Sequence, residues 1–190
     1  MKNFYKLLLL IMMPVLFGCS SSNNIRYYSL DSDTYFIGAE CGKNDNLLLV
    51  KRVKIPEYLN TKSIVYRVNE HEVIYTNQNR WVDDLEYLVN VSLVKNLRSN
   101  LKSWCIMPHS EVIENKKSGE LQISLNNFEV IKSSVAVVDY DYRVNFNNEQ
   151  LIGTIHVEEN LSNNDYEAVV AALNKAWQKS VKDMLGRIMK

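Results

Sequence analysis

The feature that most constrains the fold is a long alternation of apolar and polar side chains late in the chain. Apolar residues occupy every second position from Val138 to Phe146, with mostly polar residues between them. A short polar turn at 147–149 leads into a second alternating segment, from Leu151 to Val157. Because successive side chains of a strand point to opposite faces, this pattern predicts an antiparallel hairpin with one buried face and one wet face.

Earlier segments add further strands. We expect strands at 25–30, 47–53, 63–68, 72–76, 104–107 and 121–130. The third and fourth of these flank Asn69-Glu70-His71, which predicts a second hairpin. In the last one the apolar positions change from odd to even numbers at Asn126-Asn127, which predicts a β-bulge.

Two segments have the helical period instead. Apolar residues recur at steps of three and four over Val82–Lys102 and again over Asp165–Met189, with Ser162 or Asn164 as the expected cap of the second helix. Together these elements predict a single α+β domain over residues 25–190. We expect a mixed, mostly antiparallel sheet with two long helices packed on it.

The N-terminus has the form of a bacterial lipoprotein signal peptide, residues 1–18. Lys2 and Lys6 are followed by an apolar run and then by Leu16-Phe17-Gly18-Cys19. The run of about a dozen apolar residues is shorter than the ~20 that a membrane span requires. We expect cleavage before Cys19 and attachment of acyl chains to it, which anchor a protein without a transmembrane helix. The alternative is an ordinary signal peptide, with Cys19 there by chance.

The residues after the lipid anchor predict the location. Residues 19–24 form the lipidated cysteine and a short polar tether, which spans at most ~17 Å when extended. Ser20 stands where inner-membrane lipoproteins commonly carry aspartate. We therefore expect a lipid-anchored protein on the periplasmic face of the outer membrane.

Two cysteines remain after lipidation, Cys41 and Cys105. The periplasm is oxidising, so a disulfide between them is expected, with two buried free thiols as the alternative. The bridge would close a loop of about sixty residues and stabilise the fold by roughly 4 kcal/mol on the chain-entropy model.

The sequence gives little support for catalysis or for nucleic-acid binding. Loss of the signal peptide turns the balance of 22 basic and 22 acidic side chains into a small acidic excess, which excludes a strongly basic face for phosphates. His71, His109 and His156 are too scattered to predict a metal site. Asp139 and Asp141 share the wet face of a strand, but any alternating strand yields such pairs. We expect no enzyme and no cofactor.

Four sequence blocks carry a family resemblance. They are Tyr27-Tyr28-Ser29-Leu30, Val53-Lys54-Ile55-Pro56-Glu57-Tyr58-Leu59, Ile64-Val65-Tyr66-Arg67 and Asn79-Arg80-Trp81-Val82-Asp83-Asp84-Leu85. In this order and spacing, after the lipidated cysteine, the chain resembles the ABC-type transport auxiliary lipoprotein family over essentially its whole mature length. Asn60-Thr61 departs from the family, which often has an aspartate and a basic residue there, so a charge-mediated contact at this loop is in doubt.

The resemblance implies a non-enzymatic component of an envelope-spanning lipid transport system. Its partners would be an MCE-domain protein that forms a periplasmic tube and an inner-membrane component, and the lipoprotein would dock the tube at the outer membrane. Docking to a cyclic tube also suggests a homo-oligomeric ring. The alternative is a structural lipoprotein of a secretion or outer-membrane assembly complex.

The same blocks supply the candidate partner-binding residues. These are Pro56, Tyr58 and Leu59, together with Arg80 and Trp81, as a surface or gate near the sheet edge. The competing interpretation is structural, with Pro56 shaping a turn and Trp81 packing under the first helix.

Overall fold

The computed structural model describes residues 24–31, 41–42, 45–108, 118–147 and 149–189. Cys19, the signal peptide and most of the tether lie outside these residues. The strands are β1 (Arg26–Tyr28), β2 (Asn46–Val50), β3 (Ser63–Arg67), β4 (Val73–Trp81), β5 (Trp104–Pro108), β6 (Ser118–Ile131), β7 (Val135–Phe146) and β8 (Glu149–Asn160). The helices are α2 (Leu85–Asn100) and α3 (Tyr166–Ile188).

Strand β6 organises the sheet. The strand order is β1-β4-β3-β6-β2-β5, and β7 and β8 continue from the other edge of β6. The first part of β6 pairs in parallel with β2, and its last residues pair in parallel with β3. Its opposite edge pairs antiparallel with β7, which in turn pairs with β8. The predicted α+β fold with a mixed sheet is confirmed, and its two longest pairings are antiparallel.

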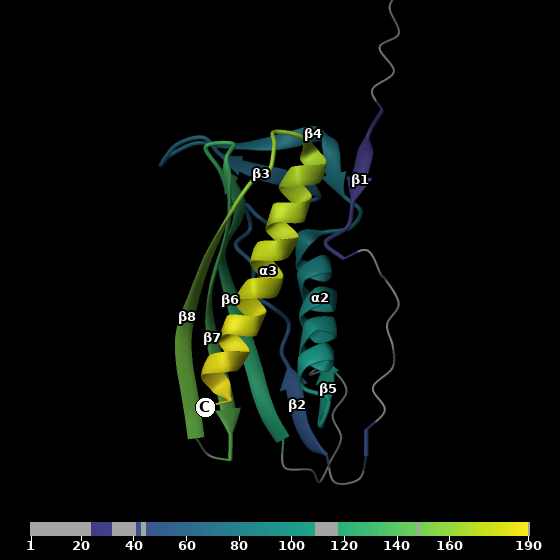
Figure 1. The fold of residues 1–190 in the computed structure, drawn as a ribbon, viewed down its shortest axis with the longest axis vertical. Coiled ribbons are helices and arrows are strands. Elements are labelled where there is room, and N and C mark those ends of the chain that lie inside the picture. The colour runs from purple at the N-terminus through teal and green to yellow at the C-terminus, as the bar shows by residue number, and fades with distance from the viewer. Residues whose placement is uncertain (1–23, 32–40, 43–44, 109–117, 148, 190) are drawn as a thin grey trace, which may run out of the picture.

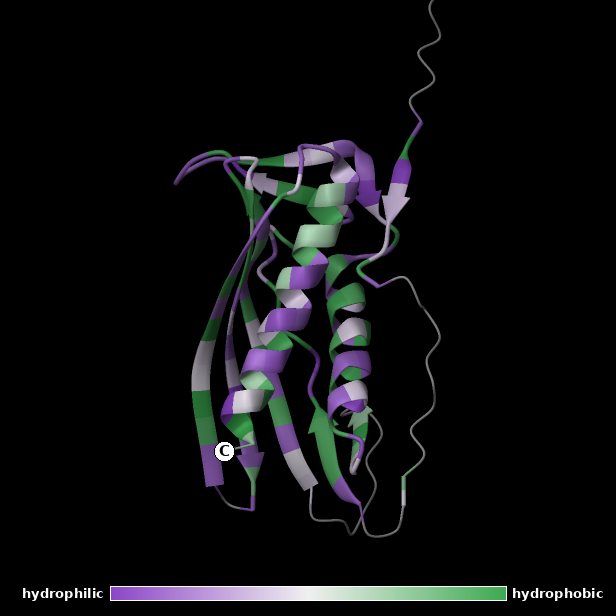
Figure 2. Cartoon of the chain, in the orientation of Figure 1, coloured by the Kyte–Doolittle hydropathy of each residue, from purple (hydrophilic) through white to green (hydrophobic). Residues whose placement is uncertain are grey.

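Both helices lie side by side over one face of the sheet (Figure 1). Hydrophobic and hydrophilic residues alternate along β6 and β8, as the period of two requires (Figure 2). The opposite face of the sheet carries no helix in the described part of the chain. None of the described helices is long and apolar enough to cross a membrane.

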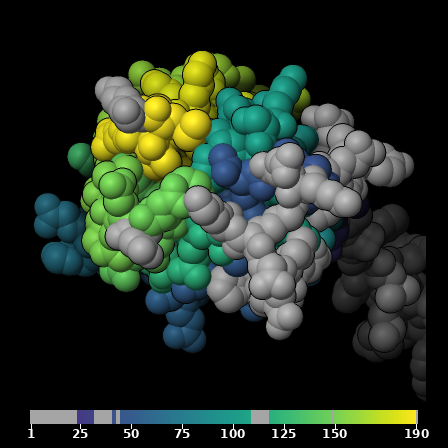
Figure 3. Space-filling model, turned by 90° about the horizontal axis from the view of Figure 1, so that it is seen from below, coloured from purple at the N-terminus to yellow at the C-terminus, as the bar shows by residue number. Residues whose placement is uncertain are grey.

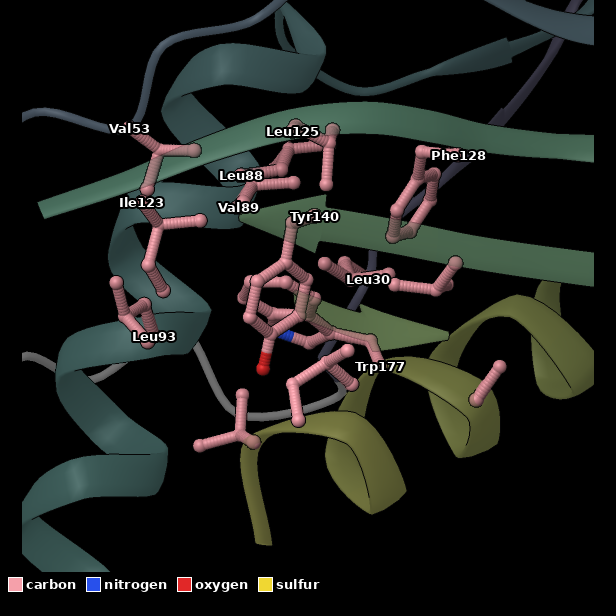
Figure 4. Packing of buried hydrophobic residues seen from close by; sticks show 14 of the residues in the cluster. Leu30, Val53, Leu88, Val89, Leu93, Ile123, Leu125, Phe128, Tyr140 and Trp177 are labelled. Atoms are coloured by element: carbon pink, nitrogen blue, oxygen red, sulfur yellow. The ribbon is translucent and has the colours of Figure 1, made fainter. Parts of the chain in front are cut away.

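Aromatic side chains form the centre of the core. Trp177 of α3 is fully buried, with its ring centroid 5.7 Å from that of Tyr140 and 6.3 Å from that of Phe128. Trp81 also packs against Phe128, with 6.3 Å between the ring centroids. Figure 4 shows Tyr140 and Trp177 pointing toward each other between the sheet and α3. Such edge-on packing of rings adds to the hydrophobic burial that holds α3 on the sheet.

The β-bulge and both hairpins are confirmed. The pairing of β6 with β7 changes register between Leu125 and Asn127. Antiparallel pairing joins β3 to β4, and β7 to β8.

Several predicted boundaries differ from the observed ones: β2 ends at Val50 rather than Val53, and α2 covers Leu85–Asn100 rather than Val82–Lys102. Strand β4 does not end at Thr76 but continues to Trp81, because its last residues pair with β1. The cap of α3 is Asp165, whose side chain accepts a 2.7 Å hydrogen bond from the Ala168 N–H. It was expected one or three residues earlier, at Asn164 or Ser162.

A disulfide joins Cys41 to Cys105, with 5.1 Å between the two Cα atoms. Cys105 is in β5, where it pairs with Leu47 of β2, and its side chain is buried. The bond therefore attaches the segment before β2 to the neighbouring edge strand.

Candidate functional site

A continuous polar network covers part of the helix-free face of the sheet. We call it the outer-face network. Its members are Tyr58, Arg67, Asn126, Asn127, Glu129, Asp139, Asp141, Thr154, His156 and Glu158. Alternation positions the strand residues, since neighbours such as Phe128, Tyr140 and Val157 belong to the helix-covered core.

A buried ion pair forms one end of the network. The Arg67 Nε atom lies 2.5 Å from Glu129 Oε1, and Nη2 lies 3.2 Å from Oε2. Glu129 is 1% exposed, so this two-point contact compensates a carboxylate that water does not reach. The hydrogen bond to Glu129 raises the pKa of Arg67 above its ordinary value.

Tyr58 connects the ion pair to the β-bulge. Its hydroxyl lies 3.4 Å from Arg67 Nη2, from the Asn126 carbonyl oxygen and from Asn127 Oδ1. The Arg67 guanidinium also lies 5.7 Å from the centre of the Tyr58 ring, a cation–π distance. Burial raises the pKa of Tyr58, and the Glu129 carboxylate raises it further, so the hydroxyl stays protonated at neutral pH.

Beyond the bulge the network becomes exposed and acidic. The Asn126 amide donates to Asp141 at 3.2 Å and to Asp139 at 3.5 Å, and the Thr154 hydroxyl donates to Asp141 at 2.6 Å. The bonds from Thr154 and Asn126 lower the pKa of Asp141. Asp141 is therefore held as a carboxylate, which is unsuited to the role of a general acid at neutral pH.

His156 closes the network on β8. Its ring nitrogens lie 3.6 Å from Asp139 Oδ2 and 3.3 Å from Glu158 Oε1. Among the described residues, no group of three His, Cys, Asp or Glu side chains has the arrangement that holds a metal ion. The network presents fixed, mainly acidic hydrogen-bonding groups to solvent, which is a surface suited to recognition.

The predicted partner-binding residues separate into two groups. Tyr58 belongs to the network, and Pro56 is half-buried in the turn before it, where its carbonyl accepts from the Leu59 N–H at 3.0 Å. Arg80 is half-buried on β4, with Nε donating to the Asn77 carbonyl at 3.1 Å. Leu59 and Trp81 were placed wrongly on a binding surface, because they are 0% and 1% exposed and belong to the core.

Sequence reasoning missed Arg67 and Glu129. After the bulge, alternation points Glu129 away from the core, which would ordinarily leave it in water. Its burial depends on Arg67 of β3 and on the loop that carries Tyr58, and both are distant in sequence. No local sequence pattern around Glu129 indicates that these distant segments bury it.

Comparison with known proteins decides the family. The family described as ABC-type transport auxiliary lipoprotein component matches residues 28–184, from β1 to the last turns of α3. The chain belongs to this family. As its description says, it is a family of auxiliary lipoproteins of transport systems.

Relatives of this auxiliary lipoprotein include the intermembrane transport lipoprotein PqiC of Escherichia coli (strain K12). It is 24% identical over 176 residues, which cover 90% of each chain, and PqiC of Shigella flexneri has the same values. A crystal structure of an uncharacterized protein has a TM-score of 0.74 at 21% identity and covers 87% of this chain and 99% of its own. Protein XCC0632 from Xanthomonas campestris has a TM-score of 0.60 at 18% identity, with 77% and 88% covered. These two structures share the fold.

Proposed function

We propose that this protein is the outer-membrane lipoprotein of an MCE-type intermembrane lipid transport system. In this proposal the acylated Cys19 anchors it, and the folded domain docks the distal end of a periplasmic tube formed by an MCE-domain protein, which continues to an inner-membrane component. One observation carries the proposal. The family match extends over the whole fold rather than one motif, and full-length relatives at 24% identity are named intermembrane transport lipoproteins.

The position of β1 supports an orientation of the domain relative to the membrane. Strand β1 begins at Arg26, shortly after a tether that spans at most ~17 Å, so the end of the domain with β1 would lie next to the membrane. Helices α2 and α3 both finish at the other end, which would then face the periplasm (Figure 1).

The outer-face network supports a charged contact with the partner. Asp139, Asp141 and Glu158 are fixed by hydrogen bonds or ion pairs before a partner arrives. Preorganised acidic groups favour a basic partner surface and accelerate its docking. We assign the contact with the partner to these three acidic residues of the outer-face network. Pro56, Tyr58 and Arg80 are further partner-binding residues. Several copies arranged as a ring would match a tube of cyclic symmetry.

Affinity purification tests this assignment. The tagged lipoprotein would be recovered from crosslinked, detergent-solubilised envelopes, and co-purifying proteins would be identified by mass spectrometry. We expect an MCE-domain protein. Recovery of secretion or outer-membrane assembly subunits in its place would overturn the proposed function.

Matched variants test the surface separately. We expect Asp141→Arg to reduce recovery of the MCE-domain protein about tenfold, because it places a cation among the acidic side chains of the outer-face network. Glu70→Arg makes the same charge change at the exposed turn of the β3–β4 hairpin and should leave recovery unchanged. Equal recovery with both variants would remove the outer-face network from the contact.

A further inference from the structure

A second feature lies at the end of the domain where both helices finish. There a partly enclosed cavity of about 510 Å³ opens between α2, α3 and the sheet. Figure 3 views the molecule from this end, where α3 (yellow), the β7–β8 hairpin (green) and α2 (teal) come together. The lining includes Leu97, Leu101, Trp104, Phe146, Leu151 and Leu185.

Polar groups are confined to a small part of this cavity. Among its described lining residues, only Glu149, Gln150 and Arg187 carry a charge or an amide. The rings of Trp104 and Phe146 lie 5.1 Å apart and are both only half-buried. Leu151 is 40% exposed, and Ile188 is half-buried. Apolar side chains from several elements therefore converge on a space that the described residues leave unfilled.

We propose that this cavity binds one acyl chain of a phospholipid, with the lipid phosphate next to Arg187. The proposal rests on the proposed transport function and adds to it direct contact between this domain and the transported lipid. The volume lies in the range of ligand pockets, roughly 300–1,000 Å³.

The chemistry of the lining favours an acyl chain over a peptide. A peptide segment would bring backbone N–H and C=O groups into the cavity, and each one left without a partner is costly. Three polar side chains cannot satisfy such a segment. An acyl chain has no polar groups along its length, and each methylene it buries contributes ~0.8 kcal/mol.

Arg187 gives the site a place for the phosphate. Its Nη1 donates to the Thr154 carbonyl and its Nη2 to Asp183, each at 2.9 Å, which fixes the guanidinium at the end of α3. The side chain remains 48% exposed. A guanidinium has five N–H donors in a fork that matches phosphate oxygens, so these two contacts leave donors for a headgroup.

Photocrosslinking in cells tests the site with the full-length lipoprotein. Phe146 would be replaced by p-benzoylphenylalanine in cells labelled with ³²P-phosphate, and Tyr87 would be replaced in the same way as the control. The Phe146 and Tyr87 side chains are similar in shape, so the replacement makes a similar change at both positions. Tyr87, however, is 58% exposed on α2 and does not line the cavity. We expect about tenfold more ³²P-labelled phospholipid adduct from the Phe146 position, because a bound ligand is largely enclosed by its pocket.

A blocking variant completes the test. Leu151→Trp should reduce the adduct at position 146 severalfold, whereas Leu151→Ala should preserve it. The melting temperature of each variant is measured to confirm that it is folded. With folded variants, equal labelling at positions 146 and 87 would overturn the acyl-chain site. A protein adduct in place of a lipid adduct would overturn it as well. Loss of the lipid adduct with continued recovery of the MCE-domain protein would leave the proposed function intact.

Discussion

The indole N–H of Trp177 donates a 3.0 Å hydrogen bond to the hydroxyl of Ser92, joining α3 to α2 inside the core. Both side chains are almost completely buried, at 0% and 1% exposure. The bond satisfies the one polar side-chain atom of Trp177 and fixes how the two helices meet.

Replacing Ser92 by alanine should therefore destabilise the protein. The indole N–H would lose its partner in a fully buried site, at a cost of about 1–3 kcal/mol. The midpoint of urea unfolding measures this cost. Ser99→Ala, on the exposed side of the same helix, is the control and should change the free energy of unfolding by no more than about 0.5 kcal/mol. Equal midpoints for the two variants would contradict the prediction.

The buried ion pair predicts a non-additive result. Arg67→Met alone leaves the Glu129 carboxylate buried without its partner and should cost about 3–5 kcal/mol. Arg67→Met combined with Glu129→Leu removes both charges and should cost less than Arg67→Met alone. A double-mutant cycle by chemical denaturation measures the coupling. A double variant less stable than Arg67→Met would contradict the prediction.

The disulfide predicts a response to reductant. Cys41 and Cys105 are 64 residues apart in sequence, and opening such a loop should lower the free energy of unfolding by roughly 4 kcal/mol. Thermal unfolding with and without dithiothreitol tests this. The Cys41→Ser/Cys105→Ser variant should unfold near the reduced protein and should not respond to the reductant. A response in that variant would mean that reduction acts elsewhere.

Tyr66 predicts a loss of stability at alkaline pH. Burial raises its pKa from 10.0 to about 12, so the folded protein retains a proton that the unfolded chain releases. This contribution is fully present below pH 10 and is lost as the pH rises toward 12. Tyr66→Phe should therefore show a shallower fall in melting temperature between pH 10 and 12 than the parent protein. Tyr87→Phe, on the surface, should follow the parent curve.

The sequence predicted the elements that have strong periodicity. The β7–β8 hairpin, both helices and the bulge in β6 follow from local patterns of apolar residues. The last residues of β4 were missed because Asn77-Gln78-Asn79-Arg80 has no apolar alternation, and only pairing with β1 and β3 makes it a strand.

The candidate site was less predictable than the fold. Tyr58 was singled out through the family resemblance, but its partners come from β3 and β6. Trp81 was also singled out through the family resemblance, whereas the tertiary fold buries it against Phe128. Local pattern determines which way a residue points, but the loop or strand that covers it is set by contacts far along the chain.

The shortest strand of the sheet determines how the domain would respond to a pull on its anchor. Strand β1 holds to β4 through only three residue pairs, Arg26 to Tyr28. A force applied through the N-terminus would act on these pairs before it reaches the rest of the sheet. Leu30, at 1% exposure, comes next and is held in the core. The three residue pairs of β1 are therefore the part of the folded domain that a pull on the anchor would load first.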